Sequence, residues 1–177
     1  PKEQAVVILG FHSVRLNDTD RYAVDVLNAI LSGMSGRLFQ EIRERRGLSY
    51  ALGAAHTPGL DKGYIILYAA TRPKEQKEVL TLLKQEVEKM REGGVSDEEL
   101  EQAIRHLIGE HRVSVQDLGG LCKRISLDEL NGLGYEAWKQ YESHLLAVRR
   151  SDVQEAARRY LLLDRCAQLL VGPNNNG

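Results

Sequence analysis

LSGMSGRLFQEIRERRGLSY, residues 31–50, is the most specific pattern in this chain. It opens with a flexible Gly/Ser turn and continues into a short helix from about 37 to 46. Gly47 is placed to end that helix in the left-handed conformation that glycine adopts at little cost. A strand begins directly afterwards. The pattern therefore predicts a turn, a helix and a strand in quick succession, with its arginines and aromatic residues at one end of a sheet.

Strand and helix patterns extend on both sides of this segment. Three further features predict strands: a β-branched run at 4–12, and two runs at 48–56 and 63–71 joined by a Pro/Gly/Asp loop typical of a hairpin. A last short apolar run at 165–171 predicts a closing strand. Apolar residues at helical spacing, with capping residues before them, predict the remaining elements, which are helices at about 20–31, 73–92, 97–115, 118–130, 135–147 and 151–160. Ser96 and Glu99 form a capping box before the third of these helices, and Gly119-Gly120 suggests a kink or break in the helical stretch at 118–130.

This order of elements indicates the fold class. Strands grouped in the middle and followed by a block of helices are typical of an α+β protein. We expect one mixed, mainly antiparallel sheet with helices packed on one face, and the first and last strands in that same sheet. A chain of 177 residues suits a single domain, which we place at 1–173 with 174–177 as a tail or linker. The abrupt start and the Asn-rich end suggest a domain cut from a longer protein.

Composition argues against several classes of partner. The 24 Lys and Arg residues balance 25 Asp and Glu residues, so the net charge of −1 predicts no binding to nucleic acid or to an anionic membrane. No apolar run approaches the roughly 20 residues of a membrane-spanning helix. Cys122 and Cys166 form no CxxC motif, and two unpaired thiols fit a reducing compartment, which favours the cytoplasm.

The segment 31–50 resembles a domain of the peptidase family that contains pitrilysin, insulin-degrading enzyme and the mitochondrial processing peptidases. In the second domain of each pair in that family, a Gly/Ser-rich turn precedes SRLFQEIREKRGLAY or a close variant. Segments 132–135, 153–160 and 170–173 resemble family segments as well, so the likeness covers nearly the whole chain. The matching positions within the motif are Gly36, Arg37, Leu38, Phe39, Glu41, Arg43, Arg46, Gly47, Leu48 and Tyr50.

Membership of that family implies a fold and a division of labour. The fold is a sheet of about six strands backed by helices, present in two copies that close around a peptide. One copy binds zinc through an H-x-x-E-H motif and a downstream Glu. The other copy binds no metal and contributes an Arg and a Tyr, which the match assigns to Arg43 and Tyr50. This chain resembles the second copy, so we expect no cofactor here and zinc in the partner domain.

The chemistry of these two residues fits the role that the resemblance implies. Peptide hydrolysis passes through a tetrahedral oxyanion, and a guanidinium and a phenol are suitable hydrogen-bond donors to it. Spacing alone leaves another interpretation open, in which Arg43 is a solvated helix charge and Tyr50 is an aromatic residue at the rim.

One other segment resembles a zinc-binding motif. His106 and His111, with Glu110 beside them, read H-L-I-G-E-H, but these histidines are five residues apart rather than four. They would point about 140° away from each other around a helix. We interpret them as helix-surface residues.

The leading hypothesis is that the chain is the non-catalytic, substrate-binding half of a zinc metallopeptidase. Its partners would be a zinc-bearing sister domain or subunit and a peptide or unfolded protein substrate. Surface meant for the sister domain could also support a homodimer. The alternatives are a non-proteolytic assembly subunit of the same family and an independent binding module.

Overall fold

The computed structural model describes residues 4–173, so the predicted tail at 174–177 lies outside the described residues. The strands are β1 (Ala5–Ser13), β2 (Ser49–Thr57), β3 (Gly63–Thr71) and β4 (Ala167–Val171). The helices are α1 (Arg21–Leu31), α2 (Gln76–Gly93), α3 (Asp97–Ser114), α4 (Leu118–Leu130), α5 (Ala137–Ala147) and α6 (Arg150–Tyr160). A π-helix (Phe39–Glu44) and two 3₁₀ turns (Pro73–Glu75 and Leu163–Arg165) complete the described elements, in the predicted order.

The strands form one antiparallel sheet in the order β2-β3-β1-β4. Strand β1 lies in the centre and pairs with β3 from Ala5 opposite Thr71 to Ser13 opposite Gly63. Its other neighbour is β4, so the first and last strands do share the sheet, as predicted. The α+β class is confirmed, while the described residues contribute four strands rather than the six or so that the resemblance implies.

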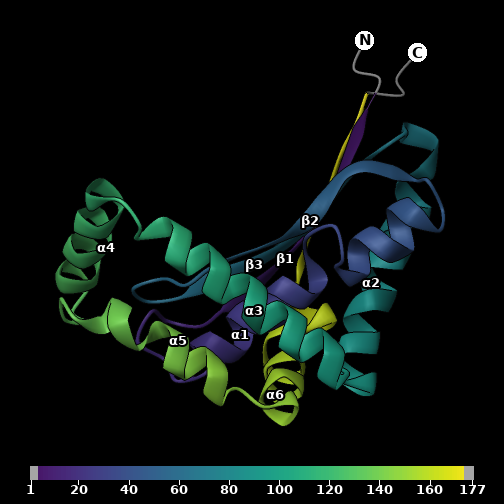
Figure 1. Ribbon diagram of the computed structural model, residues 1–177. Coiled ribbons are helices and arrows are strands. Elements are labelled where there is room, and N and C mark those ends of the chain that lie inside the picture. The colour runs from purple at the N-terminus through teal and green to yellow at the C-terminus, as the bar shows by residue number, and fades with distance from the viewer. Residues whose placement is uncertain (1–3, 174–177) are drawn as a thin grey trace.

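Helices cover one face of this sheet (Figure 1). Alternate residues of β1 and β3 are buried under them, including Leu9 and Leu67, whereas Tyr64 and Tyr68 on the opposite face are exposed. Burying a side chain of this size contributes about 1.5–3 kcal/mol, so the alternation is enough to select the covered face. Every residue of β4 is exposed. The sheet therefore has one packed face, one open face and an uncovered edge strand.

The start of α3 is a capping box, as the sequence predicts. The Ser96 hydroxyl accepts a hydrogen bond from the Glu99 backbone N–H at 3.1 Å, and the Glu99 carboxylate accepts one from the Ser96 N–H at 2.9 Å. These two bonds satisfy backbone donors that the first turn of a helix leaves free. They also set the position of Glu99, which anchors the motif at 31–50.

Helix α4 packs differently from the other helices. It lies at the far end of the molecule from α2 and α6 (Figure 1), and its only buried residue is the polar Asp128. None of the helices in residues 4–173 combines the length and apolarity needed to cross a membrane.

The pair Gly119-Gly120 lies in the first turn of α4, where the sequence suggests a kink or break. The chain turns sharply there between α3 and α4. A Cβ atom on Gly120 would lie 2.2 Å from the backbone oxygen of Ser114, whereas a Cβ on Gly109 in α3 would meet nothing within 4 Å. The turn between the two helices therefore requires glycine at 120.

We predict that Gly120→Ala lowers the free energy of unfolding by about 2–3 kcal/mol, because the new methyl group forces the α3–α4 turn apart. Urea unfolding measures this change. The matched control Gly109→Ala should raise stability by about 0.5–1 kcal/mol, since alanine favours the helix and has room there. Equal effects of the two substitutions would contradict this account of the turn.

Candidate functional site

The fold brings Arg43 and Tyr50 into contact. Arg43 lies in the π-helix and Tyr50 near the start of β2. The Arg43 guanidinium carbon is 4.7 Å from the centre of the Tyr50 ring, and Nη1 donates a hydrogen bond to the Tyr50 backbone oxygen at 3.2 Å. Tyr50 is 81% exposed, so its hydroxyl is accessible to a partner molecule. The two residues form one site at the end of the sheet where β2 begins.

Phe39 is a third member of this site, although its sequence match to the family motif assigned it no role. Its ring centre is 4.9 Å from the Arg43 guanidinium carbon, so the guanidinium contacts two aromatic rings. Each cation–π contact of this kind contributes about 0.5–1 kcal/mol at an exposed site. The signal in the sequence was the spacing of Phe39 four residues before Arg43, which favours contact on one helical face.

Glu41 determines which arginine of the run remains available. It accepts hydrogen bonds from Arg45 Nη1 and Arg46 Nε, both at 3.0 Å. Burial pushes the pKa of Glu41 upward, but the bond from Arg46, the charge of Lys89 and the bond from Arg45 together hold the pKa below its ordinary value. Arg43 has no carboxylate partner within residues 4–173. The guanidinium that lacks a carboxylate partner is therefore the one that the family match assigned.

Two backbone irregularities set the positions of Arg43 and Tyr50. The predicted short helix is a π-helix, in which the Arg45 N–H bonds to the Gln40 oxygen at 3.0 Å. Tyr50 is the extra residue of a β-bulge, because Ser49 pairs with Thr71 and Ala51 with the adjacent Ala70. Both π-turns and bulges re-aim side chains and occur often near functional sites.

Arg37 anchors the start of the motif to α3. Its guanidinium forms a bidentate pair with Glu99, with Nε and Nη2 at 2.6 and 2.8 Å from the two carboxylate oxygens. Nη2 also donates to the Gly94 oxygen at 2.8 Å. The bond from Arg37 holds the pKa of Glu99 at about 2, against an ordinary value of 4.5. This pair fixes the helix that carries Arg43 relative to the rest of the domain.

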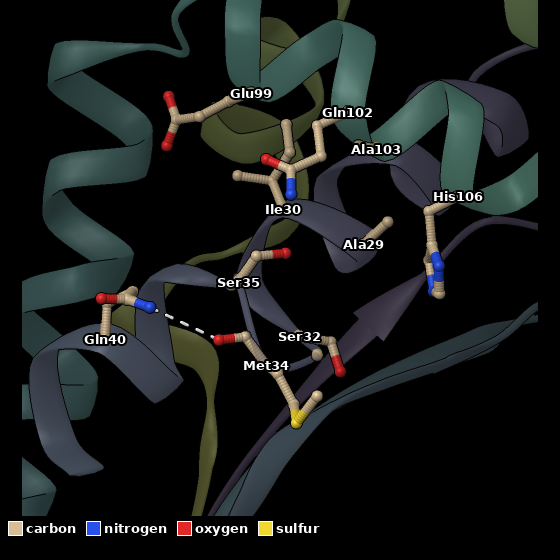
Figure 2. A pocket seen from close by; sticks show the side chains of 12 residues that line it. Ala29, Ile30, Ser32, Met34, Ser35, Gln40, Glu99, Gln102, Ala103 and His106 are labelled. Carbon is tan, nitrogen blue, oxygen red and sulfur yellow. Dashed lines mark hydrogen bonds between the residues drawn. The ribbon is translucent and has the colours of Figure 1, made fainter. Parts of the chain in front are cut away.

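A cavity of about 540 Å³ lies beside the same motif (Figure 2). Side chains from α3 and residues of the Gly/Ser turn face it from two sides, and Gln40 bonds to the Met34 oxygen at 3.4 Å. Neither Arg43 nor Tyr50 lines the cavity, so it is a neighbour of the site and not part of it. The labelled polar side chains that line it are Ser32, Ser35, Gln40, Glu99, Gln102 and His106.

The two histidines of the zinc-like segment do not converge. His106 is exposed and lies 3.3 Å from the Glu110 carboxylate, whereas His111 is buried with its ring centre 4.8 Å from that of Tyr141. Burial lowers the pKa of His111, as does the nearby charge of Arg124. In the part of the chain that the structure describes, no group of three or more His, Cys, Asp or Glu residues is placed to hold a metal ion.

Comparison with known families identifies the domain. The family described as the peptidase M16 inactive domain matches residues 1–107. This chain belongs to that family. The predicted resemblance is thereby confirmed. An uncharacterized zinc protease of Streptomyces coelicolor is 36% identical over 172 residues, which is 97% of this chain and 37% of that protein. The chain thus spans well under half the length of this relative.

Solved structures share the fold. A peptidase M16 inactive domain from Pseudomonas fluorescens has a TM-score of 0.89 at 24% identity, covering 98% of this chain and 42% of the solved chain. An inactive peptidase domain from Bordetella parapertussis has a TM-score of 0.87 at 21% identity, and the match covers 97% of this chain and 94% of the solved chain.

We predict that Glu99→Gln destabilises the domain by about 1–2 kcal/mol at pH 7, a value reduced for the partial exposure of the pair. Glutamine keeps an oxygen for the α3 cap but removes the charge and one of the two oxygens that accept from Arg37. Arg37 favours the ionised carboxylate of Glu99. The difference in free energy of unfolding between wild type and Glu99→Gln should therefore be largest above pH 4.5 and should disappear as the pH falls towards 2. Urea unfolding at several pH values measures it.

Glu101→Gln is the matched control, since Glu101 lies on the same helix in an exposed pair with Arg105 at 3.2 Å. We expect Glu101→Gln to change the free energy of unfolding by less than about 0.5 kcal/mol. A difference for Glu99→Gln that persists at pH 2 would rule out the ion pair as its cause.

Proposed function

We propose that this domain is the substrate-binding, non-catalytic half of a zinc metallopeptidase, and that Arg43 and Tyr50 bind the substrate carbonyl and stabilise its transition state. The observation that carries the proposal is the arrangement of Arg43. It has no carboxylate partner among the described residues, it is held against Phe39 and Tyr50, and it lies beside an exposed phenol. Family membership supports the same role.

The geometry of the pair suits an oxyanion. The guanidinium is fixed by one bond to a backbone oxygen and by contacts with two rings, which leaves other N–H groups for a ligand. Donors that are already oriented stabilise developing charge more effectively than mobile ones, because they need not reorganise during the reaction. The activated water in this proposal comes from zinc held by the partner domain, and no residue of this chain is assigned to that metal.

The sheet edge supports peptide binding in an extended form. Strand β2 is an edge strand and carries Tyr50 near its start. The outer side of an edge strand presents backbone N–H and C=O groups that can pair with an added strand. A peptide paired there would pass close to Arg43 and Tyr50. The partner that closes the site is a zinc-bearing domain, either in the same chain or in a second subunit.

We expect Arg43→Ala to reduce kcat/KM about 10²-fold or more in a protein that joins this domain to its zinc-bearing partner. Cleavage of a quenched fluorescent peptide, with and without a zinc chelator, measures the effect. Circular dichroism should show an unchanged fold. Arg43→Lys should recover only part of the activity, since an ammonium lacks the planar fork of donors.

Arg45→Ala is the control, because Arg45 is already paired with Glu41 and its side chain is 73% exposed. Its activity should stay close to wild type. Activity that is indifferent to Arg43→Ala would refute the site assignment while leaving the family intact. A complete lack of activity in the wild type, with peptides of several lengths, would favour the assembly-subunit role.

A further inference from the structure

A second cavity, of about 480 Å³, lies between the N-terminal end of α1 and the turn that joins α4 to α5. Arg21 and Tyr22 line it from α1, Arg124 lines it from α4, and residues 132–137 line it from the turn. No residue of the site formed by Phe39, Arg43 and Tyr50 takes part. The proposed function assigns no role to the residues that line this cavity.

Arg21 is buried at this cavity without a counter-charge. The residue is 7% exposed, its Nη1 donates to the Leu16 oxygen at 3.1 Å, and its Nε is buried with no hydrogen-bond partner. No carboxylate within residues 4–173 forms an ion pair with it. Buried guanidinium groups are normally paired, because an isolated charge loses its hydration without compensation.

Its position in the helix makes the charge still less favourable. Arg21 is the first residue of α1, where the helix dipole is positive and an acidic residue would be preferred. The N-cap residue Asp20 bonds instead to Arg159 at 2.7 Å and to the Tyr160 hydroxyl at 2.8 Å. Asp25, one turn further along, contacts His56 at 2.8 Å and Tyr141 at 3.3 Å. Both nearby carboxylates on this segment are thus engaged elsewhere.

A second helix begins at the same cavity. Helix α5 starts at Ala137 with no side-chain cap and no acidic residue in its first turn. The turn before it contains Gly132 and Gly134 at φ values of 76° and 87°, a conformation that favours glycine. In the first turn of α5 the N–H groups of Ala137 and Lys139 already donate to the oxygens of Gly134 and Glu136, both at 3.0 Å. What the helix end adds to the charge of Arg21 is the positive potential of its dipole.

Two of the other charged groups that line the cavity are ion-paired, whereas the Asp18 carboxylate bonds to a backbone N–H. Arg124 Nε donates to Asp128 at 2.8 Å, Asp18 accepts from the Arg15 backbone N–H at 2.8 Å, and Glu136 is ion-paired with Lys139. His144 also lines the cavity and stacks on Tyr22. Among the described residues at this cavity, Arg21 and Asp18 have no ion-pair partner, and Arg21 is the buried one of the two.

We infer that this cavity is a binding site for an oxyanion, a carboxylate or a phosphate group, held by Arg21, Arg124 and the N-terminal ends of α1 and α5. An anion there would supply the counter-charge that Arg21 lacks and would lie at the positive dipole ends of the two helices. The site lies apart from the Arg43–Tyr50 pair, and the inference does not depend on the proposed peptidase role.

Thermal unfolding of this chain, with Trp138 fluorescence as a second signal, tests the inference. Trp138 is the only tryptophan and lies in the first turn of α5. The probes are inorganic phosphate, acetyl-dialanine with a free carboxylate, and its amide. We expect phosphate, the free carboxylate or both to saturate a change in fluorescence and to raise Tm by about 5–10 °C at a hundredfold excess over Kd. The amide should have no effect, and which anion binds identifies the natural class.

Arg21→Met separates a binding role from a structural one. Methionine keeps much of the side-chain volume and removes the unpaired charge, so Tm without anion should stay the same or rise. Anion binding should weaken at least tenfold. The control Arg105→Met, at an exposed residue of α3, should leave binding unchanged.

If Arg21→Met fails to fold, the guanidinium resonances of Arg21 in the wild-type protein provide the test, and they should shift as anion is added. No saturable response to either anion would overturn the inference. An undiminished response in Arg21→Met, or Arg21 resonances that do not move at saturation, would overturn it as well.

Discussion

Strands β1 and β3 pair antiparallel over nine residues, from Ala5 opposite Thr71 to Ser13 opposite Gly63. This pairing makes both strands bury the same alternate residues, so the helices must cover one face of the sheet and leave the other open. The hairpin then puts β2 at an edge, and β4 takes the free side of β1. The start of β2, with Tyr50, consequently lies at the end of the sheet to which the π-helix brings Arg43.

Distribution of charge then decides what this domain can bind. Arg43, Arg45 and Arg46 are close in sequence, but one buried carboxylate, Glu41, binds the last two. The remaining guanidinium contacts two aromatic rings that orient it without neutralising it. Arg21 has no ion-pair partner among residues 4–173 for another reason, since the carboxylates near it bond to other residues. A cation that the protein leaves without a partner is available to a ligand.

Much of the fold was accessible from the sequence, because its signals are local. Apolar periodicity predicted the order of elements, and Ser96 with Glu99 predicted the start of α3. Arg43 and Tyr50 came from the family resemblance, since their spacing alone left open that Arg43 is a solvated charge. The details of the site were not predictable, because the π-helix and the bulge at Tyr50 depend on tertiary packing. Contacts between distant residues, such as His56 with Asp25, leave no local pattern.

The central claim is that Arg43 and Tyr50 act on a peptide held against a zinc-bearing partner. A structure of the two domains together, with the partner's general base replaced so that a bound peptide stays intact, tests this claim most directly. The account predicts that the Arg43 guanidinium and the Tyr50 hydroxyl lie within hydrogen-bonding distance of the carbonyl group beside the zinc. A peptide bound at the zinc with both side chains turned away from it would contradict the account.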